Sequence, residues 1–531
     1  MHRFGLRNVV SRHGRYTRAY SHGAASNAFI TQHTAELDGI STQAVRGPLE
    51  GRKIAVKDNI CTAGYDTTCA SSTLAGFRSP LDSTVVRLLR EAGALIQGKT
   101  NMDEFGMGSH SINSAHGPVV NQGGDGKLYS AGGSSGGSAM AVTTDQSWAA
   151  LGTDTGGSIR LPAAFTGTFG FKPSYGLISR NGVVAYANSL DTVGILANST
   201  HKIQQTFSAI SKFDHKDPTS VTPSTRKNIL KVTPNLRMLG RPLRIGIPGE
   251  YNIEELDQDV RHAWVELLET LQDHNISISA VSIPSTKYAL STYYVLAPAE
   301  ASSNLARYDG IRYGTRPEGS DMNAGTLFSR TRDISFGEEV KRRILLGTYT
   351  LSSEAMDNYF MQSQRVRRLV QRDFNRVFQT RNVLEEGSVG TEDGVDLLLC
   401  PTAPCSAPEL AAVEAQTPVE GYTTDVFTVP ASLAGLPAIS IPLKQRDSKS
   451  SIGMQLIGQY GTDSLVLEAS GLLEQLGLTN APKYEGSKLQ VEGKLWDPNL
   501  AMSYKNMSKY YGGGMKAVQW SGTKSGTKAS A

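Results

Sequence analysis

Hydrophobic residues in the central part of the chain follow two alternating periods, one typical of buried strands and the other of amphipathic helices. Short apolar runs predict strands at 53–56, 94–100, 243–249, 276–284, 395–404 and 437–443. Apolar residues spaced three and four apart predict helices at 82–92, 257–274 and 363–381. Strands that alternate with helices in this way are typical of one large layered α/β domain.

The helix expected at 82–92 carries signals at both of its ends. Asp82 or Ser83 can cap its first turn, and Gly93 fits the position after its last turn. The apolar side chains that line one face of this helix are Val85, Leu88, Leu89 and Ala92.

The composition is that of a globular protein and excludes some functional classes. The chain has 531 residues, of which 39% are hydrophobic and 19% are charged, and its net charge is +4. This charge is too small to indicate nucleic-acid binding by itself. No apolar run approaches the length needed to cross a bilayer. The four cysteines show neither CxxC nor Cys/His spacing, so we expect reduced thiols and no metal site.

The two ends of the chain differ from the rest. Five arginines lie within residues 1–29, and the first acidic residue is Glu36. An Arg-rich, acid-free, amphipathic start is typical of a mitochondrial transit peptide, so we predict a targeting segment at 1–30. A basic helix kept in the folded protein is the alternative. Residues 503–531 are rich in Gly, Ser and Lys, which predicts a disordered tail and leaves 31–502 for the folded domain.

Two Gly/Ser clusters lie close together, GGSSGGSAM at 132–140 and DTGGSIRLP at 154–162. Gly/Ser tracts often form flexible linkers, but both of these lie beside apolar segments. A phosphate-binding loop requires the ending GK[ST], which neither cluster has.

A nucleophile elbow G-x-S-x-G matches at 133–137, with Ser135 as the nucleophile. An elbow serine needs a histidine base later in the chain, and none of the candidates lies in a segment of obvious catalytic character. These candidates are His201, His215, His262 and His274.

A third alternative uses Lys57, which directly follows the predicted strand at 53–56. A lysine at a strand end is commonly a surface residue whose ammonium reaches water. A buried lysine instead has its pKa lowered towards neutrality, where it can act as a general base for a serine hydroxyl. The two Gly/Ser clusters would then supply a relay serine and an attacking serine.

Three blocks of sequence resemble the amidase signature family: IAVKDNI at 54–60, GGSSGGSAMAV at 132–142 and LGTDTGGSIRLPAAFTGTFGFKPSYG at 151–176. The resemblance implies a catalytic domain with a mixed central β-sheet covered by helices on both faces. It also implies amide hydrolysis by a Ser–cis-Ser–Lys triad. By motif, Lys57 is the base, Ser134 the bridging serine after a cis peptide bond, and Ser158 the nucleophile. The resemblance further implies an oxyanion hole formed by the N–H groups of Thr155, Gly156, Gly157 and Ser158.

Later blocks at 291–314, 336–352 and 425–443 are similar to one branch of this family, the glutamine-hydrolysing A subunits of tRNA-dependent amidotransferases. This resemblance implies that Tyr293, Arg343 and Asp425 bind glutamine. Tyr294 and Arg342 are adjacent alternatives.

Several partners are also implied by this branch. A B subunit that uses ATP and Mg would amidate Glu-tRNA(Gln) with the released ammonia, and a small third subunit would complete the assembly. We therefore expect the mitochondrial matrix, no membrane, and neither cofactor nor metal in this chain. Bacterial members carry a longer helical region before the lysine, whereas only 56 residues precede Lys57 here, which affects how the third subunit would contact the chain.

Two other classes of function were weighed against this one. A stand-alone amidase for small or fatty amides should lack the blocks RYDGIRYG and KRRILLGTYTLS, and both are present. A non-catalytic scaffold should have lost Lys57, Ser134 or Ser158, and all three are present.

Overall fold

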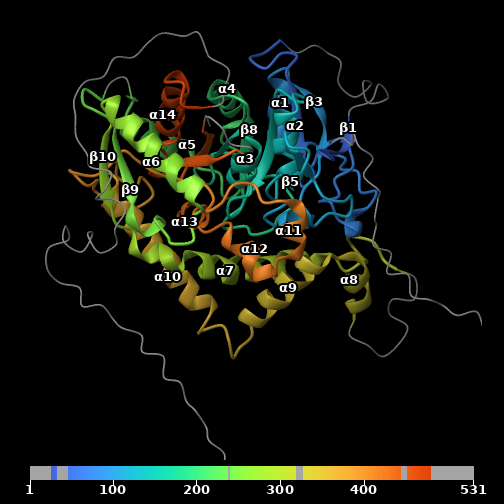
Figure 1. Ribbon diagram of the computed structural model, residues 1–531. Coiled ribbons are helices and arrows are strands. Elements are labelled where there is room, and N and C mark those ends of the chain that lie inside the picture. The colour runs from blue at the N-terminus through green and yellow to red at the C-terminus, as the bar shows by residue number, and fades with distance from the viewer. Residues whose placement is uncertain (1–25, 33–45, 237–238, 318–326, 444–450, 480–531) are drawn as a thin grey trace, which may run out of the picture.

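A mixed sheet of eleven strands runs through the chain in the computed structural model, which describes residues 26–32, 46–236, 239–317, 327–443 and 451–479 (Figure 1). In spatial order the strands are β1 (Phe29–Gln32), β3 (Leu95–Thr100), β2 (Lys53–Lys57), β6 (Ala149–Asp154), β8 (Thr192–Ala197), β7 (Phe169–Lys172), β12 (Ala438–Pro442), β13 (Gly453–Gly458), β11 (Leu397–Pro401), β9 (Arg244–Pro248) and β10 (Ser277–Val281). Strand β2 pairs in parallel with β3 and β6, whereas β6, β8, β7, β12 and β13 are antiparallel in turn. The mixed sheet expected from the sequence is confirmed.

Helices cover both faces of this sheet because consecutive side chains of its central strands point to opposite faces and are apolar on both. Ile54 and Val56 pack into the larger core with helices α1 (Thr84–Glu91), α4 (Thr200–Ile210) and α14 (Asp463–Gln475). Ala55, between them, packs into a second core with helix α2 (Gly136–Thr143). Helix α3 (Arg160–Thr166) contacts α2 on that second face. The prediction of helices on both faces is therefore confirmed.

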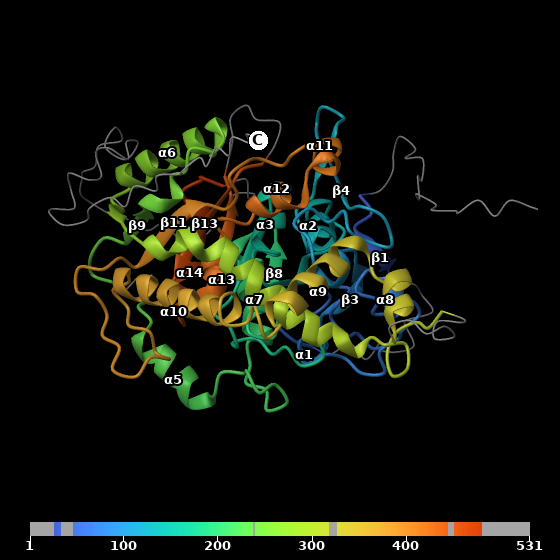
Figure 2. The same ribbon diagram turned by 90° about the horizontal axis from the view of Figure 1, so that it is seen from below.

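Further helices form a layer along the lower side of Figure 1, which faces the viewer in Figure 2. Helix α7 (Ala289–Asn304) packs against α9 (Glu338–Thr350), α10 (Phe360–Val377) and α13 (Val429–Ala434). The remaining helices and strands are α5 (Pro223–Val232), α6 (Gln258–Asp273), α8 (Ser329–Ser335), α11 (Leu410–Ala415), α12 (Pro418–Thr423), β4 (Val120–Gln122) and β5 (Leu128–Ser130).

Most elements predicted from the sequence are present, with shifted ends. Helix α1 begins after Ser83, whose hydroxyl accepts a hydrogen bond from the Val86 N–H at 3.4 Å. The helices expected at 257–274 and 363–381 are α6 and α10. Four interior strands of the described sheet, β6, β7, β8 and β13, were not predicted. Each of them contains a glycine, which weakens the strand signal in a sequence.

Strand β1 includes residue 30, so the boundary expected there for a targeting segment falls inside the sheet. Residues 1–25 and 480–531 lie outside the described residues, so the targeting segment and the tail stay predictions. All four cysteines are free thiols. None of the described helices is both long and apolar enough to span a bilayer.

Candidate active site

Lys57 ends strand β2 in the interior of the protein, with no exposed surface. Its Nζ lies 2.7 Å from Ser134 Oγ, 2.9 Å from Ser135 Oγ and 3.0 Å from Thr153 Oγ1. Burial lowers the pKa of Lys57 to about 7, although nearby carboxylates, Asp103 first among them, oppose the shift. A substantial fraction of Lys57 is therefore a neutral amine near pH 7, and such an amine can accept a proton from Ser134.

The two Gly/Ser clusters meet at this lysine. The Gly133–Ser134 peptide bond is cis, as the family resemblance implies. The Ser135 N–H donates to the Ser158 carbonyl at 3.2 Å, which joins the first cluster to the second. Within the described residues the Ser158 hydroxyl makes no hydrogen bond, so the structure does not join Ser134 to Ser158 directly. Ser158 is also the most exposed of the three predicted catalytic residues, at 9%.

Ile159, directly after Ser158, packs against three glycines of the sheet, one in each of strands β6, β7 and β8. A Cβ added to Gly152 of β6 would lie 2.6 Å from Ile159 Cδ1, and one added to Gly194 of β8 would lie 2.7 Å from Ile159 Cγ1. Gly170 of β7 would meet the Ile159 carbonyl at 2.7 Å. These distances are shorter than carbon and oxygen atoms tolerate. These glycines of β6, β7 and β8, which weaken the strand signal in the sequence, therefore make room for the segment that carries Ser158.

A buried ion pair fixes both ends of the Thr155–Ser158 loop. Arg160 binds both carboxylate oxygens of Asp154, at 3.0 and 2.9 Å, and Asp154 also accepts the Ile159 N–H. Burial is the largest influence on the pKa of Asp154 and would raise it, but the charge and hydrogen bonds of Arg160, together with Lys172 and the Ile159 N–H, lower the pKa overall. Among the described residues, none of the four N–H groups of the Thr155–Ser158 loop has an acceptor. Unpaired donors held in place beside a serine are what an oxyanion hole requires.

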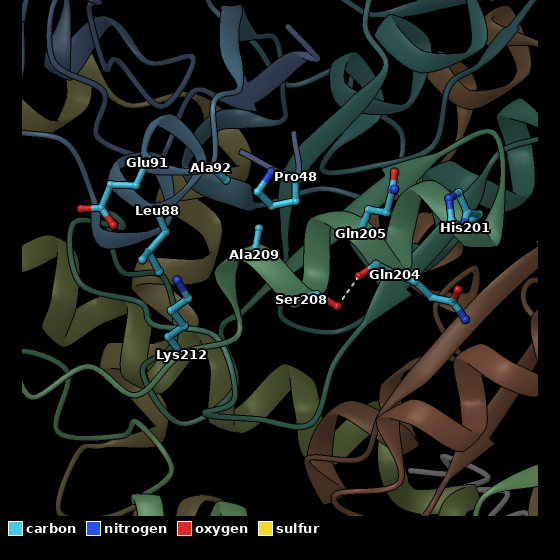
Figure 3. A pocket seen from close by; sticks show the side chains of 10 residues that line it. All are labelled: Pro48, Leu88, Glu91, Ala92, His201, Gln204, Gln205, Ser208, Ala209 and Lys212. Carbon is cyan, nitrogen blue, oxygen red and sulfur yellow. Dashed lines mark hydrogen bonds between the residues drawn. The ribbon is translucent and has the colours of Figure 1, made fainter. Parts of the chain in front are cut away.

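The elbow alternative does not fit the surroundings of Ser135. Its hydroxyl accepts from Lys57 and lies 3.3 Å from the Thr153 carbonyl. His201, one of the candidate bases, instead lines a separate cavity of about 410 Å³ between α1 and α4 (Figure 3). The Ser208–Gln204 hydrogen bond lies in that cavity, and no residue predicted for the active site lines it.

One stretch outside the two clusters does match the phosphate-loop pattern and was overlooked in the sequence. Residues 93–100 read GALIQGKT. The structure places the lysine of this match, Lys99, inside strand β3, fully buried. Lys99 Nζ donates to the Ile60 carbonyl at 2.6 Å and lies 3.6 Å from Asp58 Oδ1. A nucleotide-binding lysine follows a loop and faces phosphate, so this match is structural.

Two residues predicted to bind glutamine lie against the Thr155–Ser158 loop. A Cβ added to Gly156 would lie 2.7 Å from the Tyr293 ring, and one added to Gly157 would lie 3.3 Å from Asp425 Oδ1. Asp425 Oδ2 accepts from the Ser109 hydroxyl at 2.7 Å. Burial raises the pKa of Asp425 to about 7.

The alternative tyrosine, Tyr294, is also buried, and its hydroxyl lies 3.4 Å from Asp425. Both tyrosines therefore border the same site. Tyr293 lies at the loop, and Tyr294 lies at the carboxylate.

Arg343, on helix α9, is buried in a cage of aromatic rings. Its guanidinium lies 5.3 Å from the Tyr294 ring centre and 5.4 Å from that of Tyr422. Its Nε donates to Glu339 at 2.8 Å and its Nη1 to the Tyr186 hydroxyl at 2.8 Å. The rest of its N–H groups, one on Nη1 and two on Nη2, have no partner in the described parts of the chain. They can bind both oxygens of a carboxylate.

Arg342 does not share this cage. Its side chain is 44% exposed and pairs with Glu339. It lines the mouth of a cleft of about 160 Å³ that Ser109, Arg343 and Tyr422 also line. Of the two adjacent arginines, Arg343 is therefore the inner one, and Arg342 lies at the entrance.

Helix α9 is anchored to the catalytic layer by a buried carboxylate. Glu104 accepts from the Gly337 N–H, at the start of α9, at 2.8 Å, and from the Ser71 hydroxyl. The preceding residue, Asp103, accepts from the Ser111 and Asn113 N–H groups at 2.9 and 3.0 Å. Two consecutive residues thus hold the loop that carries Ser109 and the helix that carries Arg343.

Sequence reasoning missed several residues that support these groups. They are Thr153, which binds Lys57, and Ser109, Tyr186, Glu339 and Tyr422 around the cleft. Thr153 and Glu339 lie within recognised blocks, so their positions offered a signal. Ser109, Tyr186 and Tyr422 lie outside those blocks. No cluster of metal-ligating side chains that could hold an ion occurs in the described segments.

A buried lysine of lowered pKa that contacts one serine, close to a second serine beside unpaired N–H donors, is the arrangement expected of a serine hydrolase that uses lysine as its base. The model of the amidase family matches residues 13–467, and the chain belongs to this family.

Its relatives include the A subunit of the mitochondrial glutamyl-tRNA(Gln) amidotransferase of Coccidioides posadasii. The two are 54% identical over 451 residues, which is 82% of this chain and 90% of that protein. The protein of the same name from Fusarium vanettenii is 56% identical over 433 residues, which is 78% of this chain and 85% of that protein. The crystal structure of the glutamyl-tRNA(Gln) amidotransferase A subunit from Thermotoga maritima is similar with a TM-score of 0.68 and 35% identity, and covers 86% of this chain and 90% of that one.

Proposed function

We propose that this chain is the glutamine-hydrolysing A subunit of a mitochondrial glutamyl-tRNA(Gln) amidotransferase. The observation that carries the proposal is the 2.7 Å contact between Lys57 Nζ and Ser134 Oγ, beside the loop of unpaired N–H donors that ends in Ser158. The names of the relatives support the choice of enzyme. The contacts of Lys57 with Ser134 and the unpaired N–H groups beside Ser158 support the catalytic roles proposed for these residues.

The reaction begins with a proton relay. Lys57, neutral when its pKa is about 7, takes the proton of the Ser134 hydroxyl, and Ser134 takes the proton of Ser158. The Ser158 oxygen attacks the amide carbon of the glutamine side chain. The resulting oxyanion is stabilised by the N–H groups of the Thr155–Ser158 loop, each worth about 2.7–4 kcal/mol.

As the tetrahedral intermediate collapses, the proton moves back along the relay. Lys57 returns its proton through Ser134 to the leaving nitrogen, and ammonia departs. A glutamyl ester remains on Ser158, and water hydrolyses it by the same relay to give glutamate. Every proton is recovered, so the cycle needs no cofactor in this chain.

Glutamine is selected by its two charges. Arg343 binds the α-carboxylate through its remaining N–H groups, and Asp425 pairs with the α-ammonium. Tyr293 contributes one further hydrogen bond beside Gly156. A simple amide leaves these buried charges unpaired, so the pocket disfavours it.

The partners follow from the fate of ammonia. A B subunit that uses ATP and Mg amidates Glu-tRNA(Gln), and a small third subunit completes the enzyme in the mitochondrial matrix. This chain contacts the tRNA mainly through its partner.

Reconstitution tests this function. The purified complex should convert Glu-tRNA(Gln) to Gln-tRNA(Gln) with glutamine and ATP, and the single chain should fail at that step. Amidation by the single chain with ATP would refute the division of labour. A complex in which Ser158→Ala still uses glutamine would refute the role of this chain.

A further inference from the structure

Exposed hydrophobic side chains gather on one projecting hairpin of the molecule. Helices α9 and α10 meet at residues 351–359, and this end of the pair stands clear of the sheet in Figure 1. Six of the twenty exposed large hydrophobic side chains in the described residues lie within the 17 residues 345–361. They are Leu345, Leu346, Tyr349, Met356, Tyr359 and Met361, which we call the hairpin patch.

The hairpin patch is contiguous. The rings of Tyr349 and Tyr359 lie 5.9 Å apart across the hairpin, and Leu345 lies one helical turn before Tyr349. The Met361 N–H donates to the Met356 carbonyl at 3.0 Å, which brings these two residues together. Leu345 is 71% exposed and Tyr349 is 57% exposed. Contiguous apolar surface of this kind marks interaction sites, and Tyr and Met are enriched in protein interfaces.

A row of arginines extends the hairpin patch along α10. Arg365, Arg368, Arg372 and Arg376 follow Met361 on one exposed face of the helix. Arg368 pairs with Glu385, and Arg376 lies 3.7 Å from Asp373. Arg365 and Arg372 form no ion pair in the described part of the chain. A binding partner therefore needs an apolar surface bordered by carboxylates.

The hairpin patch lies on the same helix as the substrate cleft. The inner face of α9 carries Arg343 and Glu339, and Arg342 lies at the cleft entrance, one turn before Leu345 and Leu346. Ammonia leaves this cleft as a small molecule that water would dilute and protonate. The subunit that consumes ammonia therefore has to sit where the cleft opens, next to the hairpin patch.

We propose that the hairpin patch is the docking surface for the ammonia-consuming subunit, which presents an apolar surface bordered by carboxylates. The inference rests on the proposed function, because that function supplies the product to be handed on. Docking on the outer face of α9 also stiffens the helix that carries Arg343.

Co-purification of the full complex tests the inference. The wild-type chain and the Leu345→Lys/Tyr349→Lys variant are each co-expressed with the ammonia-consuming and small third subunits. The matched control is Leu230→Lys on helix α5, where the side chain is 79% exposed and lies in a different element. We expect the double variant to raise the Kd of the complex at least about 30-fold and the control to change it less than about twofold.

Two further readouts separate docking from activity and from folding. Ammonia release from glutamine by each chain alone reports the proposed function separately from docking. Thermal melting reports folding, and Leu345→Ser/Tyr349→Ser replaces the lysine variant if that one melts early. If the double variant releases ammonia and assembles as well as wild type, docking at the hairpin patch is overturned. If the wild-type chain neither releases ammonia nor assembles, the proposed function fails and the inference fails with it.

Two other outcomes would also overturn the proposal. In the first, light scattering finds a dimer of the wild-type chain alone that the double variant cannot form, while assembly is unchanged. In the second, the wild-type chain binds phosphatidylserine-containing vesicles, the double variant does not, and assembly is unchanged. These results would assign the hairpin patch to a second copy of the chain or to a lipid surface.

Discussion

The proposed catalytic centre and the proposed glutamine pocket share the Thr155–Ser158 loop, yet they are built from different kinds of residue. The catalytic centre is made of backbone groups and small side chains from two short blocks, with one lysine beneath them. The pocket is made of large charged and aromatic side chains from four separate segments, which include Tyr186, Arg343 and Tyr422. In the proposed mechanism the first arrangement cleaves any amide that reaches it, and the second selects which amide binds.

The largest effect is expected from substitutions that disable the catalytic centre and leave the pocket intact. Ser158→Ala and Lys57→Met should each lower kcat on the order of 10⁴-fold or more, for glutamine and for a simple aliphatic amide alike. Both changes remove the relay that serves every substrate. Steady-state ammonia release measures this loss, with thermal melting as the folding control.

Ser135→Ala provides the contrast. It removes one hydrogen bond to Lys57 and should cost only about tenfold, because Ser134 still connects to the lysine. If Ser135→Ala lowered kcat as much as Ser158→Ala, the result would favour the alternative in which Ser135 is the nucleophile of a G-x-S-x-G elbow.

The second largest effect is expected from substitutions that disrupt the pocket and leave the catalytic centre intact. Asp425→Asn should lower kcat/KM for glutamine about 30- to 1,000-fold, because the α-ammonium loses its buried partner. Arg343→Lys should act similarly, since lysine cannot reproduce two parallel hydrogen bonds. Turnover of a simple amide should change less than about threefold. Equal losses on both substrates would mean that these residues support the fold or the relay.

The third effect is a difference in pH dependence. Lys57 must lose its proton to act as a base, and burial places its pKa at about 7. Asp425 must be ionised to bind the α-ammonium, and burial raises its pKa to about 7. Below pH 7 both groups gain protons, so kcat/KM for glutamine should fall with a slope approaching two. For a simple amide the slope should approach one.

Asp425→Asn sharpens this pH prediction. It removes one titrating group, so glutamine should then show a slope of one. A slope of one for wild-type enzyme with glutamine would contradict the role of Asp425.

The smallest effect is expected at Glu104, whose carboxylate connects the loop beside the catalytic centre to the start of helix α9. Glu104→Ala releases the start of α9, which should raise KM for glutamine about five- to tenfold and leave kcat for a simple amide within about twofold. Glu104→Gln keeps an acceptor for the Gly337 N–H and should restore most of the loss. Initial-rate kinetics on the three proteins measures this split. A loss of kcat on both substrates, without rescue by glutamine at 104, would assign Glu104 to the fold alone.

The same contrast explains what the sequence could predict. Lys57, Ser134 and Ser158 were predicted as a triad because the contiguous blocks that contain them resemble the amidase signature family, whereas the residues alone left Ser135 as an alternative nucleophile. Strands β6, β7 and β8 escaped prediction because Gly152, Gly170 and Gly194 dilute their apolar pattern. These three glycines make room for Ile159. Two of them are distant from Ile159 in sequence, so no local sequence pattern indicates the contact.

The glutamine pocket was only partly predictable for a related reason. Arg342 and Arg343 are neighbours in one motif, and only burial separates the caged arginine from the exposed one. Tyr186 and Tyr422 complete the cage from segments more than two hundred residues apart. Tertiary packing alone brings them together.

Trapping the covalent intermediate is the most direct test of Ser158 as the nucleophile and Lys57 as its base. The complex is mixed with glutamine, quenched in acid within one turnover, digested, and analysed by mass spectrometry. The account predicts one glutamyl group on the peptide that contains Ser158, and its loss in Lys57→Met. A glutamyl group on Ser135, or turnover without any group on Ser158, would contradict it.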